Sequence, residues 1–315
     1  MVGNAPQERT IAVRYKNERT RREEVVPVAY FERGKGKKPV IFIHGLGGSA
    51  RDGLLLFQHM RGRRISISLP GFGHTPALTV DQNGIPAYRE MVRLAMDALG
   101  IEKAYFYGMS MGGATALAFG AKYPERAHAV IAQGAPFYGR NFPAWLLGFT
   151  HVLAQWGKQR SLFFWWLGLD TFGWCEGKLK ESVRTHPDLV RSVFRGLMTP
   201  EEEMLATPEV KMIGVADFLE ADARAAVEAG ESIFRMDLRD ALRNYTVPVL
   251  VCDGERPRSQ ALRTTQDIME LLPRGLAKCY LFPQVGHMAT MLCSQEAADV
   301  ASSFFRESQK MRPAQ

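Results

Sequence analysis

The residues best suited to chemistry in this 315-residue chain surround Ser110, in the pentapeptide Gly-Met-Ser-Met-Gly at positions 108–112. An aromatic, strand-like stretch (residues 105–107) precedes the pentapeptide, and a run of small residues with helical apolar spacing (residues 113–119) follows it. Glycines two residues before and after a serine let a strand and a helix pack closely around a sharp turn. The pattern therefore predicts a nucleophilic serine, and a glycine-rich turn with an idle serine is the alternative interpretation.

A serine hydroxyl is a weak nucleophile unless a base takes its proton, and His287 is the best candidate for that base. It follows Gly286 in a loop after the last predicted strand, at the carboxyl edge of the sheet.

Acyl transfer also requires N–H donors for the developing oxyanion. The glycine-rich stretch His-Gly-Leu-Gly-Gly-Ser at positions 44–49 lets the backbone approach a ligand closely, although a simple tight turn is its plainer interpretation.

The elements that must position these residues alternate between strands and helices along most of the chain. Such alternation predicts a mostly parallel sheet with right-handed crossovers and helices on its faces. We expect strands at 10–15, 25–32, 40–44, 64–69, 104–107, 127–132, 247–252 and 277–282, and helices at 88–99, 113–123, 259–272 and 296–305.

The alternation stops between about residues 135 and 243, where the patterns are helical and no convincing strand occurs. A helical block between two strands of one sheet predicts an inserted cap. The expected organisation is a core formed by residues 1–134 and 246–315, with a helical cap at residues 135–245.

The first half of the predicted cap is unusually aromatic. Three uses for these side chains stay open, namely packing on the core, lining a pocket for a greasy substrate, or peripheral contact with a lipid surface. Lys158, Gln159 and Arg160 interrupt the apolar stretch, so it falls short of the ~20 residues that a membrane span needs. The aromatic residues are Phe142, Trp145, Phe149, Trp156, Phe163, Phe164, Trp165, Trp166, Phe172 and Trp174.

Composition and charge narrow the class of protein. The formal net charge is +7, but no basic stretch is interleaved with aromatic residues, which argues against nucleic-acid binding. The first ten residues lack the apolar core of a secretory signal, and the 4 cysteines have no metal-ligand spacing. We therefore expect reduced thiols, a cytoplasmic location, and neither a metal nor an organic cofactor.

Five segments together resemble a capped member of the α/β-hydrolase fold family. The resemblance implies an α/β fold with a mostly parallel central sheet, flanking helices and an inserted helical cap. It covers about residues 25–305, and the segments occur in the family's order at positions 44–49, 69–75, 108–113, 247–255 and 286–287.

The resemblance also implies a role for each matching residue. Ser110 corresponds to the nucleophile and His287 to the base. The backbone N–H groups of Leu46 and Met111 correspond to the oxyanion hole. The same loop implies a substrate-binding role for His44, Gly45 and Gly47.

The catalytic acid is where this chain departs from the family. Relatives typically carry a carboxylate three residues after the glycine matched by Gly254, and here that residue is Pro257. The loop after strand 127–132, which is the family's other acid position, also lacks a carboxylate. Asp253 and Glu255 are the nearby candidates, and Asp253 is our prediction. A Ser–His dyad is also chemically workable, because a triad without its carboxylate keeps part of its activity.

The sequence therefore predicts a serine hydrolase that cleaves an ester or related acyl bond of a hydrophobic small molecule. A second hypothesis keeps the pocket but changes the reaction to C–C hydrolysis, lyase or acyltransferase chemistry, because the fold hosts all of these. A third is a non-catalytic binder of hydrophobic ligands that has lost its acid. Ser110 and His287 argue against the third hypothesis, and Pro257 argues for it.

Overall fold

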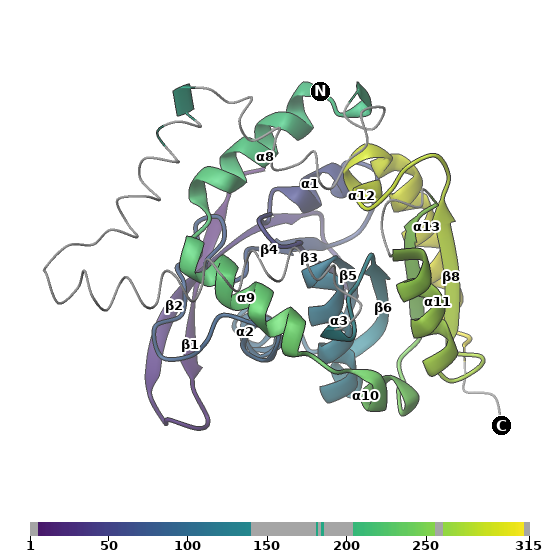
Figure 1. The fold of residues 1–315 in the computed structure, drawn as a ribbon, viewed down its shortest axis with the longest axis horizontal. Helices are drawn as coiled ribbons and strands as arrows, with labels where there is room; N and C mark the ends of the chain where they lie inside the picture. The colour runs from purple at the N-terminus through teal and green to yellow at the C-terminus, as the bar shows by residue number, and fades with distance from the viewer. Residues whose placement is uncertain (1–5, 140–180, 182–183, 186–203, 256–260, 312–315) are drawn as a thin grey trace, which may run out of the picture.

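The computed structural model describes residues 6–139, 181, 184–185, 204–255 and 261–311. Their centre is an 8-stranded sheet with strand order β1-β2-β4-β3-β5-β6-β7-β8 (Figure 1). β2 pairs antiparallel with both β1 and β4, and the other neighbours are parallel. The strands are β1 (Arg9–Lys16), β2 (Glu23–Arg33), β3 (Val40–Ile43), β4 (Arg64–Ile67), β5 (Ala104–Met109), β6 (Ala127–Gln133), β7 (Val249–Gly254) and β8 (Ala277–Phe282).

All the predicted strands are present, and so are the four predicted helices, with shifted ends. The helix predicted from residue 88 begins at Ile85, because Pro86 in its first turn has the fixed φ that suits a helix start. The short helices α1 and α12 were not predicted. The helices are α1 (Asp52–Phe57), α2 (Ile85–Ala98), α3 (Met111–Lys122), α8 (Pro208–Glu220), α9 (Ala223–Arg235), α10 (Arg239–Arg243), α11 (Ala261–Leu271), α12 (Ala289–Leu292) and α13 (Ser294–Ser308).

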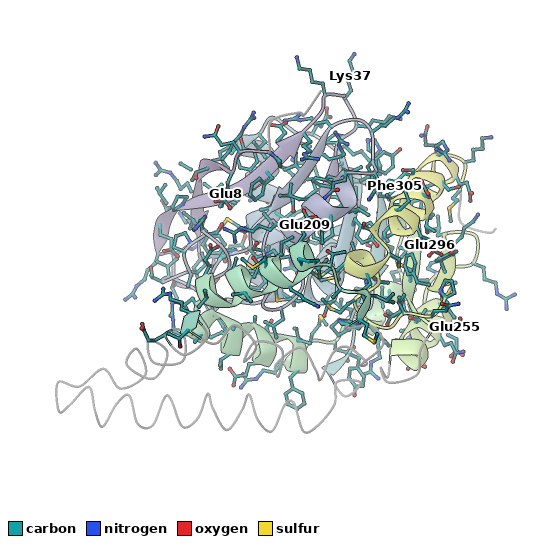
Figure 2. The ribbon with its side chains drawn as sticks, turned by 90° about the horizontal axis from the view of Figure 1, so that it is seen from above. Glu8, Lys37, Glu209, Glu255, Glu296 and Phe305 are labelled. Atoms are coloured by element: carbon teal, nitrogen blue, oxygen red, sulfur yellow. The ribbon has the colours of Figure 1, made fainter. Side chains whose placement is uncertain are left out.

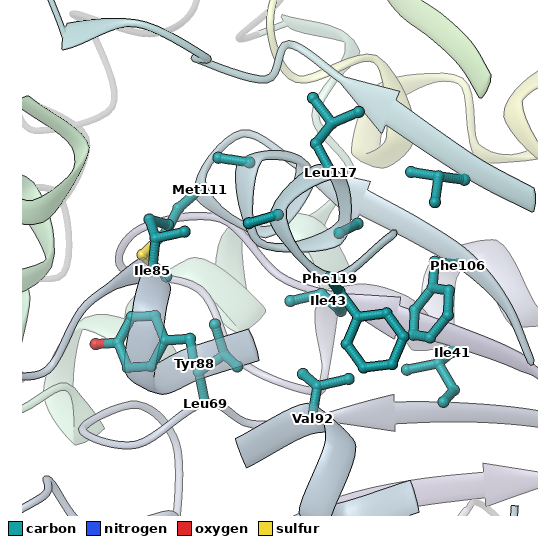
Figure 3. Close-up of a cluster of buried hydrophobic side chains, with 14 of the residues drawn as sticks. Ile41, Ile43, Leu69, Ile85, Tyr88, Val92, Phe106, Met111, Leu117 and Phe119 are labelled. Atoms are coloured by element: carbon teal, nitrogen blue, oxygen red, sulfur yellow. The ribbon is translucent and has the colours of Figure 1, made fainter. Parts of the chain in front are cut away.

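Helices cover both faces of the sheet, and each face has its own buried cluster. Successive side chains of a strand point to opposite faces, so Ile41 and Ile43 of β3 join one cluster while Phe42 joins the other. Figure 3 shows the first cluster, in which Phe119 of α3 packs on Phe106 of β5 with ring centroids 4.5 Å apart. Burial on both faces explains why the central strands are continuous apolar runs.

Three of the helices, α8, α9 and α10, lie in the second half of the predicted cap. α9 and the residue before it make polar contacts with core loops: Asp222 N–H donates to the carbonyl of Gly71, and Asn83 donates to Glu228 at 2.8 Å. In the described part of residues 135–245, the only β pairing is the single bridge between Tyr138 and Asp237. The aromatic residues from Phe142 to Trp174 lie outside the described residues, so the cap boundaries stay a prediction.

Two smaller findings concern membranes and thiols. Within the described ranges, no helix combines the length and apolarity needed to cross a bilayer. Cys252, Cys279 and Cys293 are free thiols, and Cys175 lies outside the described residues.

Candidate active site

Ser110 occupies a sharp turn between β5 and α3. Its φ of 54° and ψ of −118° place it in a region that residues with a Cβ rarely adopt, so surrounding contacts must hold the turn. One such contact is the Ser110 N–H, which donates to the carbonyl of Gln133 on β6 at 2.7 Å. The residue is half-buried, so its side chain keeps access to solvent.

The two glycines of the pentapeptide are required by close backbone contacts. A Cβ on Gly108 would collide with the carbonyl oxygen of Gly112. A Cβ on Gly112 would collide with the Ile43 carbonyl oxygen and lie 2.5 Å from that of His44. The start of α3 therefore packs directly on the end of β3, which brings the serine turn beside the loop that follows β3.

That loop begins with His44, whose ring is buried and fully engaged by backbone groups. Its Nδ1 lies 2.8 Å from the Gly45 carbonyl oxygen, and its Nε2 accepts the Leu69 N–H at 2.9 Å. These partners assign a neutral ring with its proton on Nδ1. Burial lowers the pKa of His44 to about 4. The ring thus joins the loop to Leu69, two residues after the end of β4, and has no nitrogen left for another partner.

The rest of the loop lies against the serine turn. A Cβ on Gly45 would be 3.4 Å from the Ser110 Cβ, in ordinary contact. Gly47 has a φ of +78° with nothing within 4 Å of a Cβ position, so its conformation, not crowding, favours glycine. Among the described residues, neither the Leu46 N–H nor the Met111 N–H has a hydrogen-bond acceptor. Both N–H groups are therefore available to a ligand.

His287 lies in the loop after β8, and the end of β6 holds it from two directions. Its carbonyl oxygen accepts a hydrogen bond from Gln133 Nε2 at 3.0 Å. A Cβ on Gly134, whose φ is +54°, would lie 2.6 Å from both Cε1 and Nδ1 of the His287 ring. The ring keeps 18% of its side-chain surface exposed. The predicted base is thus fixed beside the residue that receives the Ser110 N–H.

Among the described residues, Asp253 is the one carboxylate within ion-pair range of the predicted base. Its Oδ1 lies 3.9 Å from His287 Nδ1, within ion-pair range but longer than a hydrogen bond. The side chain is 0% exposed; Oδ1 accepts the Gly254 N–H at 2.9 Å, and Oδ2 has no partner among the described residues. Burial raises the pKa of Asp253, while His287 and the Gly254 N–H oppose that rise.

Glu255, the other candidate acid, has a different environment. Its backbone N–H donates to the Phe282 carbonyl at 2.9 Å. Its side chain is exposed at the edge of the molecule (Figure 2). Pro257 lies outside the described residues. Of the two carboxylates, only Asp253 makes an electrostatic contact with His287 in the described structure.

Gln133 is a site residue that the sequence did not single out. Its side chain is 0% exposed, and its Oε1 accepts hydrogen bonds from Tyr107, at 2.8 Å, and from Thr290. With its bond to His287, the amide connects three segments of the core. The available signal was a polar residue directly after the apolar strand predicted at residues 127–132.

A buried carboxyl pair lies behind the His44 loop and joins the core to the predicted cap. Asp52 of α1 and Asp217 of α8 are both nearly inaccessible, and a Cβ on Gly48 would collide with Asp52 Oδ2. Arg51 lies 3.2 Å from Asp217 and donates twice to Glu220, at 2.5 and 2.8 Å. Burial raises the pKa of Asp217 to about 6 and that of Asp52 well above its ordinary value.

No group of three or more His, Cys, Asp or Glu side chains within the described ranges is arranged to hold a metal ion. The groups that can do chemistry at this sheet edge are therefore a hydroxyl, an imidazole, a buried carboxyl group and two backbone N–H donors. This set matches the requirements of nucleophilic acyl transfer.

Comparison with known proteins identifies relatives of the whole chain and of its parts. The model of the α/β hydrolase fold family matches residues 38–292. A 2-hydroxy-6-oxo-6-phenylhexa-2,4-dienoate hydrolase from Comamonas testosteroni is 36% identical over 113 residues, which are 34% of this chain and 39% of that protein. A 2-hydroxymuconate semialdehyde hydrolase from Pseudomonas putida is 26% identical over 280 residues, covering 85% and 87% of the two chains.

The match to the first of these relatives spans only 39% of its length. Among solved structures, a thermophilic esterase from Thermogutta terrifontis superimposes with a TM-score of 0.70 at 18% identity, covering 96% of this chain and 99% of that one. At this identity the likeness concerns the fold. The family match spans most of the chain and the strand order agrees with the predicted architecture, so the protein belongs to the α/β-hydrolase fold family.

Proposed function

We propose that the protein is a serine hydrolase that cleaves an ester or related acyl bond of a hydrophobic small molecule. The observation that carries this proposal is the arrangement at one sheet edge: a strained serine turn, a half-buried histidine and a buried aspartate meet around the end of β6. The hydrolase names of the relatives are consistent with it.

The reaction follows from the roles of these groups. Ser110 Oγ attacks the carbonyl carbon while His287 takes the hydroxyl proton, and the N–H groups of Leu46 and Met111 hold the oxyanion. Collapse of the intermediate expels the alcohol, which receives the proton from His287, and leaves an acyl group on Ser110. A water molecule then attacks the acyl carbon while His287 takes its proton, and the acid is released as His287 returns that proton to Ser110 Oγ.

Asp253 orients His287 and stabilises its charged form in this proposal. The 3.9 Å between Asp253 Oδ1 and His287 Nδ1 lies within ion-pair range, so the carboxylate can stabilise a protonated imidazole. Asp253 Oδ2, which has no partner within the described ranges, can accept a second bond. His44 acts through the loop: its backbone-engaged ring fixes Gly45 and Gly47, whose backbone faces the substrate.

Labelling with a fluorophosphonate probe tests the activated serine. Wild type should be modified at Ser110, Ser110→Ala should not react, and His287→Ala should react at least ~10³-fold more slowly, because the base is lost. Ser303→Ala, which removes a serine on α13, serves as the matched control and should react like wild type. An unreactive wild-type Ser110, under conditions that label a known serine hydrolase, would contradict the proposal and favour a non-catalytic binder.

C–C bond hydrolysis is the second candidate, favoured by the names of the relatives from Comamonas testosteroni and Pseudomonas putida. The same serine and histidine would serve it, so labelling does not separate the two reactions. Turnover of 2-hydroxy-6-oxo-6-phenylhexa-2,4-dienoate by wild type but not by Ser110→Ala would favour this candidate. Turnover of p-nitrophenyl butyrate alone would favour the esterase.

A further inference from the structure

Gln133 contacts both residues on which the proposed chemistry depends. Its backbone oxygen accepts the Ser110 N–H at 2.7 Å, and its side-chain Nε2 donates to the His287 carbonyl at 3.0 Å. We infer that Gln133 is a positioning residue that sets the placement of the nucleophile relative to the base. This inference rests on the proposed function, because it assigns Gln133 a role in the same reaction.

The amide of Gln133 is held in one orientation. Its Oε1 accepts from the hydroxyl groups of Tyr107 and Thr290, which lie 3.0 Å from each other. An amide oxygen with two donors leaves the NH₂ group on the opposite side, where it meets His287. All three polar side chains are almost completely buried, so water cannot replace a lost bond.

The base needs such an anchor, because the part of the chain that the structure describes gives its ring few direct polar contacts. The nearest oxygen of Asp253 is 3.9 Å away, and part of the ring is exposed. The main constraints come from the last residue of β6 and the residue after it: Gly134 limits the His287 ring, and Gln133 holds the His287 backbone. Residues 133 and 134 therefore act together, one through a hydrogen bond and the other through contact.

Gln133→Met tests the anchor, because methionine has a similar length and neither donates nor accepts strongly. The second-order rate constant for fluorophosphonate labelling should fall ~10- to 100-fold, since a small displacement of a catalytic group has effects of this size. Tyr245→Phe is the matched control: it deletes a buried hydroxyl that donates to the Leu117 carbonyl, away from the site. Tyr245→Phe should lower the melting temperature about as much as Gln133→Met does, and its labelling rate should stay within about threefold of the wild-type rate.

Gln133→Glu separates positioning from general stability. A glutamate keeps the shape and can accept from Tyr107 and Thr290, but it donates to the His287 carbonyl only when protonated. Burial favours the protonated form, so the labelling rate relative to wild type should be higher at about pH 6 than at about pH 8. For Gln133→Met, the labelling rate relative to wild type should not change with pH. The inference would be overturned if this relative rate varied with pH in the same way for both variants, or if Gln133→Met labelled as fast as wild type.

A second measurement keeps this test distinct from the test of the proposed function. Of the 7 histidines, the imidazole signal of His287 can be assigned by NMR from its loss in His287→Gln. In Gln133→Met this signal should move, whereas Tyr245→Phe should leave it in place. If wild-type Ser110 does not label, the proposed function fails; if the His287 signal is unchanged in Gln133→Met, the positioning role fails whether or not Ser110 labels.

Discussion

At the scale of residues, the site combines one strained backbone position with a buried carboxyl group. The positive φ of Ser110 costs free energy, which packing of the flanking glycines against neighbouring backbone offsets. Asp253 loses its hydration on burial, which raises its pKa, and His287 compensates for part of that cost. Strain and incomplete pairing of this kind are typical of sites whose groups must react.

The first prediction at this scale concerns the acid. Asp253→Asn should lower kcat for a p-nitrophenyl ester by ~10²- to 10⁴-fold, because a neutral isostere cannot stabilise the protonated histidine. Glu255→Gln is the matched control and should keep kcat within about twofold, since exposed side chains away from a site have small effects. Equal activities of the two variants would contradict Asp253 as the acid and leave a dyad.

The second prediction concerns Gly134. Gly134→Ala should reduce kcat at least ~10-fold, because its Cβ would press on the His287 ring at 2.6 Å. Gly62→Ala is the control: its φ of +86° is equally unfavourable for alanine, but nothing lies within 4 Å of its Cβ position. Both variants should lose about 1–2 kcal/mol of unfolding free energy from backbone strain. Similar kcat values in the two would contradict a contact effect.

At the scale of elements, the site depends on how strand ends and helix starts meet. The end of β6 touches the serine turn before α3 and the histidine loop after β8. The loop after β3 is supported from behind by α1, whose Asp52 pairs with Asp217 of α8. The predicted cap is therefore joined to the loop after β3 through a buried carboxyl pair.

That pair predicts a pH dependence of stability. The pKa of Asp217 is raised to about 6 by burial, so its proton stabilises the fold at low pH and this contribution is lost as pH rises through about 6. Asp217→Asn removes the titrating group. From about pH 4.5 to about pH 7.5, the stability of Asp217→Asn against urea should therefore increase relative to that of wild type.

The control for this prediction is Asp240→Asn, which makes the same change at a carboxylate whose side chain is 96% exposed. Its unfolding free energy should differ little from that of wild type, because the side chain is exposed. If the stability difference between Asp217→Asn and wild type also stays constant with pH, the proton on Asp217 does not contribute to stability and the prediction is wrong.

At the scale of the whole molecule, two buried clusters hold the sheet between its helices. The cluster that contains α3 also fixes the start of that helix and hence the serine turn (Figure 3). Phe119 has 0% exposure and packs between Phe106 and Tyr123, with ring centroids 4.5 and 5.4 Å away.

Phe119→Ala should therefore lower the unfolding free energy by about 3–5 kcal/mol, as expected for a large buried side chain that leaves a cavity. Urea denaturation followed by circular dichroism measures this loss. Val25→Ala, at a side chain on β2 that is 61% exposed, is the control and should change it by less than about 0.5 kcal/mol. A loss below about 1 kcal/mol for Phe119→Ala would contradict the packing role.

The sequence by itself determined the fold class and the strands and helices of the core. Apolar runs of the right length predict buried strands, and the glycines around Ser110 predict the turn, because both are properties of a few adjacent residues. The helix α1 was missed because it is only 6 residues long and carries little periodic signal.

Only the tertiary structure decided which distant side chains meet. The 3.9 Å between Asp253 and His287, the bonds of Gln133 to both sides of the site and the pairing of Asp52 with Asp217 join segments far apart in the chain. Such contacts depend on strand register and loop direction, which no local pattern of residues encodes. The pentapeptide thus predicted the turn that carries Ser110. The register of β6 against its neighbouring strands brings Gln133 and His287 to that turn.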